Sequence, residues 1–318
     1  MGYRTNGRDR KGAPEWGRVV DIFAHPQMFL SKSTIAFLAR QLSIPVSSLG
    51  VDVVGGGSIN HTYRLTVNGR DSYFLKQNDA DRHPGLFEKE RNGLLFLAEQ
   101  HCLRIPQVIF CDLYNNEQLL VLEWIQPCHA DGLFWKQFGE QLSRLHQCTH
   151  NQFGFAEDNY MGALPQSNDY ATTWTAFFVT NRLMPQVQLA VQNDLLPALY
   201  ARQFEKLYLK LDTIFTPEPP SLLHGDLWSG NFLCTVQSVP VLIDPAVYYG
   251  HRSMDLAMTT LFGGFDKAFY ETYDYYFPLP ANYAEQWDIC NLYPLLIHLN
   301  LFGKSYLPAI TAILKKFD

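Results

Sequence analysis

The stretch SLLHGDLWSGNFLCTVQSVPVLIDPA, residues 221–246, restricts what this chain can fold into more than any other part of the sequence. Asp226 precedes Asn231, two short apolar segments follow, and a second carboxylate, Asp244, comes directly after them. The two segments are predicted to pair as a β-hairpin, because turn-forming residues separate them. Such a hairpin would bring Asp244 back beside Asn231. Each residue alone would fit an ordinary loop, where Asp and Asn are common. It is their order in the sequence that favours a functional site over such a loop.

The order of these side chains suits phosphoryl transfer. That reaction needs little covalent chemistry from a protein, but it needs a group that accepts the hydroxyl proton and oxygen ligands for magnesium along the phosphates. We expect Asp226 to be the catalytic base, and Asn231 and Asp244 to hold Mg²⁺ beside ATP. The kinase catalytic loop has the same Asp-to-Asn spacing, which favours this interpretation over a plain hairpin.

Composition excludes several other classes of protein. The 318 residues suffice for one large or two ordinary domains, and 47% hydrophobic residues predict a packed core. The net charge of −6 argues against nonspecific binding of nucleic acid. No run of about 20 apolar residues exists, so we expect no membrane span. The six cysteines are widely spaced without a CxxC pair, which argues against structural zinc and favours reduced thiols in the cytoplasm.

The first 28 residues differ from the rest of the chain. They are rich in Gly and Arg and have no sustained hydrophobic period. We expect residues 1–28 to form a disordered extension outside the fold.

A glycine-rich turn lies between two predicted strands of the first half of the chain. Alternating apolar residues predict strands on either side of it, and its residues are Gly55, Gly56, Gly57 and Ser58. A strand follows the glycines instead of a helix, which disfavours Rossmann and Walker A motifs. A glycine-rich hairpin tip can instead cover nucleotide phosphates with backbone N–H groups. A simple flexible turn is the alternative.

Lys76 ends the next apolar strand, and such lysines are usually exposed to solvent. In a kinase lobe it would instead reach inward to the α- and β-phosphates and need a carboxylate partner. The following predicted helix offers Glu90 on the face that carries Leu94, so we expect Glu90 to be that partner. The apolar strand LLVLEWI then ends at a predicted lobe boundary, where Glu123 and Ile125 would flank the adenine.

The second half of the chain is predicted to be mainly helical, with a loop over residues 151–168. Trp228 lies two residues past Asp226, where its indole could stack on a sugar or an ammonium group, although a core position is equally compatible. His298 interrupts an apolar helix; it is a candidate for substrate binding, with internal hydrogen bonding as the commoner alternative. Asp255 opens a helix, and we expect a structural role for it at the helix dipole, with bracing of the catalytic loop through His224 or backbone as the alternative.

Several motifs together resemble the fructosamine kinase (ketosamine-3-kinase) family. They are GGGSIN, FLKQN, FEKERNGL, HGDLWSGN, LIDPAVYYGHRSMDLA and HLNLFG, and they span about residues 29–318. HGDLWSGN and the tyrosines after Asp244 are the most specific, because plain HGD and IDP pieces also resemble aminoglycoside and choline kinases. Many family members are expected to carry a cysteine in the glycine turn, where this chain has Ser58, so no redox switch is expected there.

The resemblance implies an α+β, two-lobed protein-kinase-like fold. Residues 29–125 would form a nucleotide-binding lobe with an antiparallel sheet and a helix, and residues 126–318 a mainly helical catalytic and substrate lobe. It further implies an ATP- and Mg²⁺-dependent enzyme that phosphorylates the 3-hydroxyl of ketosamines, the adducts of sugars with small or protein amines, and so promotes deglycation. The substrate would be its main partner, with no nucleic acid and no membrane, and the protein would be a monomer or weak dimer.

Two alternatives remain open from the sequence. The first is another small-molecule kinase of this fold, acting on an aminoglycoside, choline or a free sugar. Aminoglycosides are polycations, and the acidic residues between 265 and 288 would suit them if they lined the substrate pocket. The second is a catalytically inactive binding module, which the intact set of Lys76, Asp226, Asn231 and Asp244 disfavours.

Overall fold

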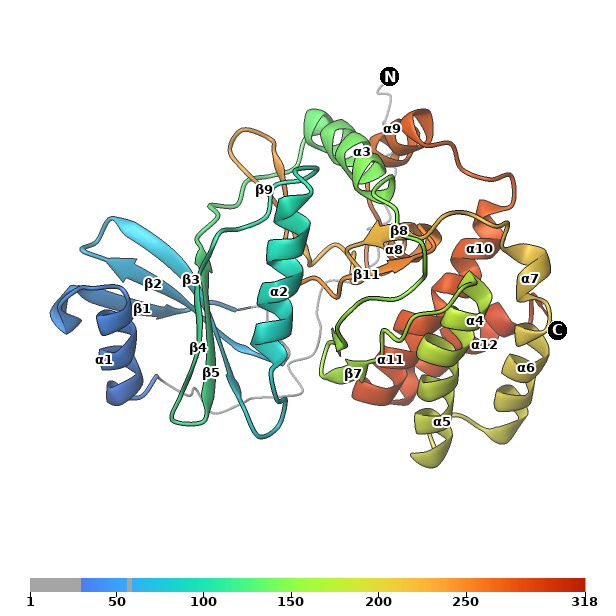
Figure 1. The fold of residues 1–318 in the computed structure, drawn as a ribbon, viewed down its shortest axis with the longest axis horizontal. Helices are drawn as coiled ribbons and strands as arrows, with labels where there is room; N and C mark the ends of the chain where they lie inside the picture. The colour runs from blue at the N-terminus through green and yellow to red at the C-terminus, as the bar shows by residue number, and fades with distance from the viewer. Residues whose placement is uncertain (1–29, 56–58, 318) are drawn as a thin grey trace, which may run out of the picture.

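An antiparallel sheet forms the first lobe of the molecule (Figure 1). The computed structural model describes residues 30–55 and 59–317, so the expected extension 1–28 and the turn residues Gly56, Gly57 and Ser58 lie outside the described residues. The sheet has five strands in the order β1-β2-β3-β5-β4. They are β1 (Leu49–Val53), β2 (His61–Val67), β3 (Asp71–Asp79), β4 (Val108–Tyr114) and β5 (Glu117–Glu123).

Two helices cover the two faces of this sheet. Successive side chains of a strand point to opposite faces, and β5 is apolar on both. Leu119 and Val121 pack with α1 (Lys32–Gln41), whereas Leu120 and Leu122 pack against α2 (Leu86–Glu99). The near-continuous apolar run of β5 is thereby explained, because an interior strand covered on both faces needs no polar side.

The second lobe is mainly helical and is built around an extensive apolar core (Figure 1). In this lobe a π-helical turn (Val179–Leu183) lies between two helices, and a 3₁₀ turn (Lys304–Tyr306) precedes the last helix. Another 3₁₀ turn (Val46–Ser48) belongs to the first lobe, where it precedes the sheet. The helices of this lobe are α3 (Gly132–His146), α4 (Trp174–Phe178), α5 (Met184–Gln192), α6 (Ala198–Tyr208), α7 (Leu211–Ile214), α8 (Ser253–Met258), α9 (Lys267–Tyr276), α10 (Tyr283–Cys290), α11 (Leu292–Phe302) and α12 (Leu307–Leu314). Within the described ranges, no helix has the length and apolarity that crossing a membrane requires.

Short strand pairs carry the loops that face the first lobe. The pairs are β6 (Asn159–Met161) with β7 (Leu164–Gln166), β8 (Ser221–Leu223) with β11 (Tyr248–Gly250), and β9 (Phe232–Cys234) with β10 (Pro240–Leu242). The β9–β10 pair confirms the hairpin predicted before Asp244. The pair β6–β7 lies in the stretch where the sequence predicts only a loop, and this expectation was incomplete.

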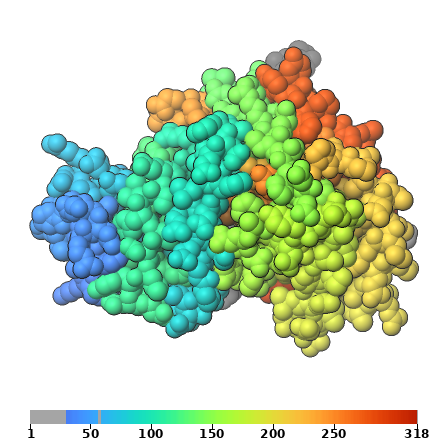
Figure 2. Space-filling model, viewed as in Figure 1, coloured from blue at the N-terminus to red at the C-terminus, as the bar shows by residue number. Residues whose placement is uncertain are grey.

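Helix α2 belongs to the first lobe but is bound closely to the second. Gly93 faces the segment after Asp244: a Cβ built there would lie 3.2 Å from a Val247 methyl carbon, tighter than most real contacts. Glu157 of the second lobe pairs with Lys89 at 3.0 Å and accepts a hydrogen bond from Asn92 at 3.0 Å. On the face shown in Figure 2, atoms of α2 directly adjoin the chain that follows α3. The two lobes are therefore in contact through this helix.

Candidate active site

A cavity of about 560 Å³ lies between the two lobes. Strands β2, β3 and β5 and helix α2 border it on one side, and the β8–β9 loop, the segment after β10, the β6–β7 turn and α11 border it on the other. Every predicted site residue that the structure describes lines this cavity: Gly55, Lys76, Glu90, Glu123, Ile125, Asp226, Trp228, Asn231, Asp244 and His298.

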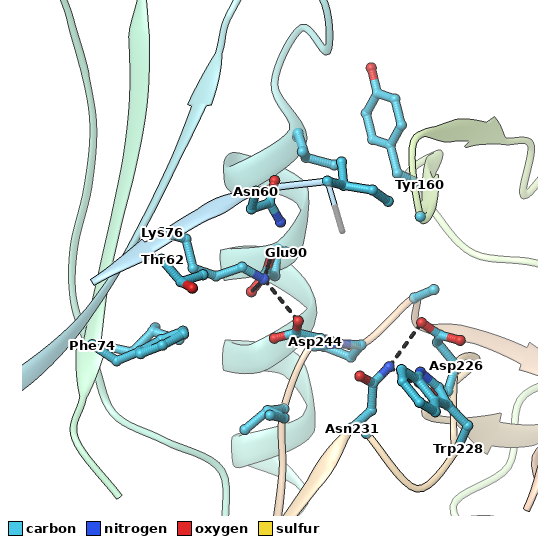
Figure 3. Close-up of a pocket in the computed structure, with 18 of the residues that line it drawn as sticks. Asn60, Thr62, Phe74, Lys76, Glu90, Tyr160, Asp226, Trp228, Asn231 and Asp244 are labelled. Carbon is cyan, nitrogen blue, oxygen red and sulfur yellow. Dashed lines mark hydrogen bonds and ion pairs between the residues drawn. The ribbon is translucent and has the colours of Figure 1, made fainter. Parts of the chain in front are cut away.

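Asp226 sits in a loop that is held rigidly by hydrogen bonds. The buried Asp255 of α8 accepts hydrogen bonds from the backbone N–H groups of His224 at 2.8 Å and Gly225 at 2.9 Å. Asn231 donates through Nδ2 to the Asp226 carboxylate at 2.8 Å and also to its backbone carbonyl (Figure 3). Asp255 thus braces the loop that presents Asp226, which was the less favoured of the two roles considered from the sequence.

The left-handed backbone of Gly225 is required by this loop. Its φ is +85°, a conformation that side chains disfavour. A Cβ at this position would lie 2.0 Å from the carbonyl oxygen of Ala246. The glycine before Asp226 is therefore needed for both its conformation and its lack of a side chain.

The electrostatic surroundings of Asp226 keep its proton affinity high. Burial raises the pKa of Asp226 to about 7, with the hydrogen bond from Asn231 opposing the shift and the negative charges of Asp244 and Asp255 adding to it. A carboxylate with a pKa near the working pH combines adequate basicity with a substantial ionised fraction. Asp226 can therefore accept a proton far better than an exposed aspartate.

Lys76 is buried and paired with two carboxylates. Its Nζ lies 2.7 and 2.8 Å from the two carboxylate oxygens of Glu90, and 3.1 Å from Asp244 across the lobe interface (Figure 3). Burial alone would lower the pKa of Lys76, but the charges of Asp244 and Glu90 outweigh it and raise that pKa above its usual value. Lys76 is therefore a fixed cation facing the cavity, as predicted, and Glu90 is its partner.

Asn231 and Asp244 offer oxygen atoms to the cavity. Asp244 follows β10 with φ +56°, and 39% of its side chain is exposed. Asn231 uses its Nδ2 for Asp226, so its amide oxygen remains the acceptor available to a ligand. In the described part of the chain, no group of three or more His, Cys, Asp and Glu side chains could hold a metal alone. Two hard oxygen donors fit Mg²⁺, which is usually bound by one or two protein side chains together with phosphates and waters.

The end of the cavity beside β5 is apolar. Phe74, Leu122, Ile125 and Ile243 line it. The Glu123 carboxylate turns aside to Arg104, at 2.6 Å, so Glu123 lines the cavity without a free charge. An apolar slot at the end of the sheet suits a flat aromatic base.

Trp228 and His298 line the other end of the cavity, on the side of Asp226. His298 Nδ1 lies 2.7 Å from the carbonyl oxygen of Pro294, and a carbonyl can only accept, so Nδ1 carries the proton. Burial lowers the pKa of His298, which leaves a neutral imidazole whose Nε2 can accept a hydrogen bond from a hydroxyl group.

The β6–β7 turn supplies cavity residues that the sequence did not predict. Asn159, Tyr160, Met161 and Gly162 line the cavity. The turn is held by long-range bonds, from Asn159 to the Val247 carbonyl at 2.8 Å and from the Tyr160 hydroxyl to the first lobe. The local sequence indicated this turn only through Gly162, which has φ +62° in the structure. A single turn glycine identifies no function.

The acidic residues between 265 and 288 lie outside this cavity. Asp266 caps α9, Glu271 pairs with Lys267, and Asp274 accepts a backbone hydrogen bond from Leu279. These carboxylates therefore do not make the cavity between the lobes acidic, although Glu271 and Asp274 line a separate pocket beside α9.

Comparisons with known proteins agree on one family. The sequence profile described as Fructosamine kinase matches residues 30–317. A provisionally named ketoamine kinase of Enterococcus faecium is 39% identical over 83% of this chain and 94% of its own length. The chloroplastic protein-ribulosamine 3-kinase of Arabidopsis thaliana is 33% identical over 83% of this chain and 81% of its own. The crystal structure of a candidate fructosamine-3-kinase from Thermobifida fusca is 31% identical, covering 88% of this chain and 98% of that one, with a TM-score of 0.79. The predicted two-lobed fold is confirmed.

Proposed function

Because the chain belongs to the fructosamine kinase family, we propose that this kinase transfers the γ-phosphoryl group of ATP to the 3-hydroxyl of ketosamines. The acceptors would be fructosamine or ribulosamine adducts of small amines or proteins, and their phosphorylation would promote loss of the sugar from the amine. One observation carries the proposal: Lys76, Asp226, Asn231 and Asp244 converge on a single cavity between the lobes. We propose residues 29–125 as the nucleotide-binding lobe and residues 126–318 as the catalytic and substrate lobe.

The contacts described above suggest a role for each polar group. Asp226 would accept the proton of the 3-hydroxyl as its oxygen attacks the γ-phosphorus and ADP leaves. Lys76, held by Glu90, would bind the α- and β-phosphates, and the turn at Gly55 to Ser58 would cover them. Mg²⁺ held by Asn231 and Asp244 would neutralise negative charge on the phosphates when it is bound.

Substrate binding would use the end of the cavity beside Asp226. Trp228 would stack on the sugar or its ammonium group, and the neutral His298 would accept a hydrogen bond from a sugar hydroxyl. The adenine would lie at the apolar end, beside the backbone between Glu123 and Ile125. The six cysteines form no disulfide bonds, which supports our proposal of a reducing, cytoplasmic location. We also propose that the protein is a monomer or weak dimer.

A substrate panel with ribulose-lysine, fructose-lysine, kanamycin and choline tests the proposal. We expect ATP- and Mg²⁺-dependent turnover of the ketosamines alone, with phosphorus NMR placing the phosphate on the 3-hydroxyl. Chelation of divalent cations should abolish turnover, and Mg²⁺ should restore it. The alternative small-molecule kinase is less favoured because the acidic residues between 265 and 288 do not line the cavity. Turnover of kanamycin or choline but not of ketosamines would overturn our proposal.

The pH dependence of turnover gives a second test, which concerns Asp226. The base acts when deprotonated, so kcat/KM for ATP should fall as the pH drops through about 7, the raised pKa of Asp226, approaching a roughly tenfold loss per pH unit. Ionisation of ATP itself would also alter the profile, but it would persist in the Asp226→Asn variant. The part of the acidic limb that arises from Asp226 should be lost in that variant, which leaves only the part due to ATP. An identical limb in both proteins would contradict the assignment of the base.

A further inference from the structure

Phe262 occupies an unusual backbone position beside the candidate active site. It follows α8 with φ +53°, and Gly263 and Gly264 continue in positive φ at +118° and +65°. A bulky residue in the left-handed region is an outlier that persists only where the surrounding structure holds it. Here the hydroxyl of Ser229, one residue after Trp228, donates a hydrogen bond to the Phe262 carbonyl oxygen at 2.9 Å. The loop that carries Phe262 is therefore attached to the loop that carries Asp226.

The ring of Phe262 remains accessible and adjoins both predicted substrate residues. Its exposed fraction is 39%. Its centroid lies 4.7 Å from that of His298 and 6.0 Å from that of Trp228, which it meets edge-on at 83°. Trp228 and His298 line the cavity whereas Phe262 does not, so the exposed ring of Phe262 lies beside these two residues, just outside the cavity.

Two further aromatic rings continue this surface. Phe302 lines the cavity and is 42% exposed, and Tyr306 lies 5.1 Å from His298 between centroids. We call Phe262, Phe302 and Tyr306 the aromatic rim. The rim is apolar apart from the tyrosine hydroxyl, and the carboxylates that line the cavity are Glu90, Glu123, Asp226 and Asp244, none of them a rim residue. A substrate group at the rim would therefore contact ring faces and not a carboxylate.

We propose that Phe262 is a specificity-determining residue that contacts the amine component of the ketosamine. This inference rests on the proposed function. The 3-hydroxyl must reach Asp226, and the sugar is short, so the nitrogen at its first carbon and the chain attached to that nitrogen extend beyond Trp228 and His298. The protonated nitrogen is common to all ketosamines, so the rim would distinguish them by the aliphatic chain attached to it, and the chain of a modified lysine matches the rim in apolar area. Phe262 would thus discriminate between ketosamines with the same sugar but different amines.

The experiment compares two ribulosamines, one of methylamine and one of Nα-acetyllysine amide. The informative variant is Phe262→Asn, because asparagine tolerates the left-handed backbone and so removes the ring with little risk to the fold. Phe262→Tyr retains the ring face. Tyr275→Ala is a matched control, since Tyr275 of α9 is an exposed aromatic residue (81%) whose ring adjoins Tyr276 and neither Trp228 nor His298.

The expected result is a KM effect that depends on the amine. For the acetyllysine adduct, Phe262→Asn should raise KM by roughly five- to twentyfold, with kcat and the KM for ATP nearly unchanged. The methylamine adduct should change by less than about twofold, since it cannot reach the ring. Phe262→Tyr and Tyr275→Ala should resemble the unmodified protein for both substrates.

Each other outcome contradicts a defined statement. Equal KM changes for the two adducts, or none, would overturn the role of Phe262 while leaving the proposed function intact. A fall in kcat for both substrates would indicate that the ring only supports the loop of Asp226, which would also overturn specificity. Failure of the unmodified protein to phosphorylate these ribulosamines and the corresponding fructosamines would refute the proposed function, and the inference with it.

Discussion

Asp226→Asn is expected to lower kcat by about 10²- to 10⁴-fold, the usual contribution of a positioned general base. The amide has nearly the shape of the carboxylate, and its oxygen can still accept the hydrogen bond that Asn231 donates. Lys76, Glu90 and the apolar slot are untouched. ATP should therefore bind with almost unchanged affinity, as measured by calorimetry, while the rate of ketosamine phosphorylation collapses.

The stability of the same variant provides an independent control. The pKa of Asp226 rises from an ordinary 3.8 in an unfolded chain to about 7 in the folded protein. The folded state therefore binds the extra proton between these values, and its stability decreases as the pH rises from about 4 to about 7. Asp226→Asn lacks this ionisation, so its Tm should exceed that of the unmodified protein most clearly at pH 8 and least at pH 4. Retained turnover, or a Tm difference independent of pH, would contradict our description of Asp226.

Gly225→Ala is expected to have the largest effect on stability of any single methyl group added near the site. The new Cβ would combine a disfavoured backbone conformation, φ +85°, with a 2.0 Å approach to the Ala246 carbonyl oxygen. Because that oxygen belongs to the backbone, the chain itself must shift. We expect a loss of about 3 kcal/mol or more in the free energy of unfolding, together with loss of activity, because the displaced loop carries Asp226.

Gly69→Ala is the matched control for this prediction. Gly69, in the turn between β2 and β3, has a similar φ of +67°, but nothing lies within 4 Å of a Cβ built there. Its substitution should cost only about 1 kcal/mol, with kcat unchanged. Urea denaturation of both variants separates two contributions to the loss of stability. The disfavoured positive φ is common to both variants, whereas the steric clash with Ala246 arises only in Gly225→Ala. Equal losses for Gly225→Ala and Gly69→Ala would show that the Ala246 contact relaxes without cost.

Local sequence patterns predicted the parts of this molecule that depend on nearby residues. The hairpin before Asp244 followed from two apolar segments and the turn between them, and helical spacing identified Glu90 as the partner that a kinase-like lobe would require for Lys76. Both are short-range consequences of periodicity. The near-continuous apolar run of β5 also corresponds to the two helices that cover the sheet.

The remaining features depend on contacts between segments far apart in the sequence. The β6–β7 turn is held by the Val247 carbonyl and by the first lobe, so its own residues indicated only a loop. The positive φ of Phe262 has no local signal except the two following glycines, because phenylalanine does not favour that conformation. Composition likewise could not predict whether the acidic residues of α9 and α10 line the cavity, because helix caps and ligand pockets both use Asp and Glu.

The close approach of α2 to the second lobe at Gly93 has a consequence for regulation. In protein kinases the corresponding lysine–glutamate pair must be assembled by repositioning a helix, which activation-loop phosphorylation controls. Here Glu157 and the Val247 contact already hold that helix in place, and Lys76 already meets Glu90. No movement of α2 is therefore needed to bring Lys76 and Glu90 together in this arrangement of the lobes.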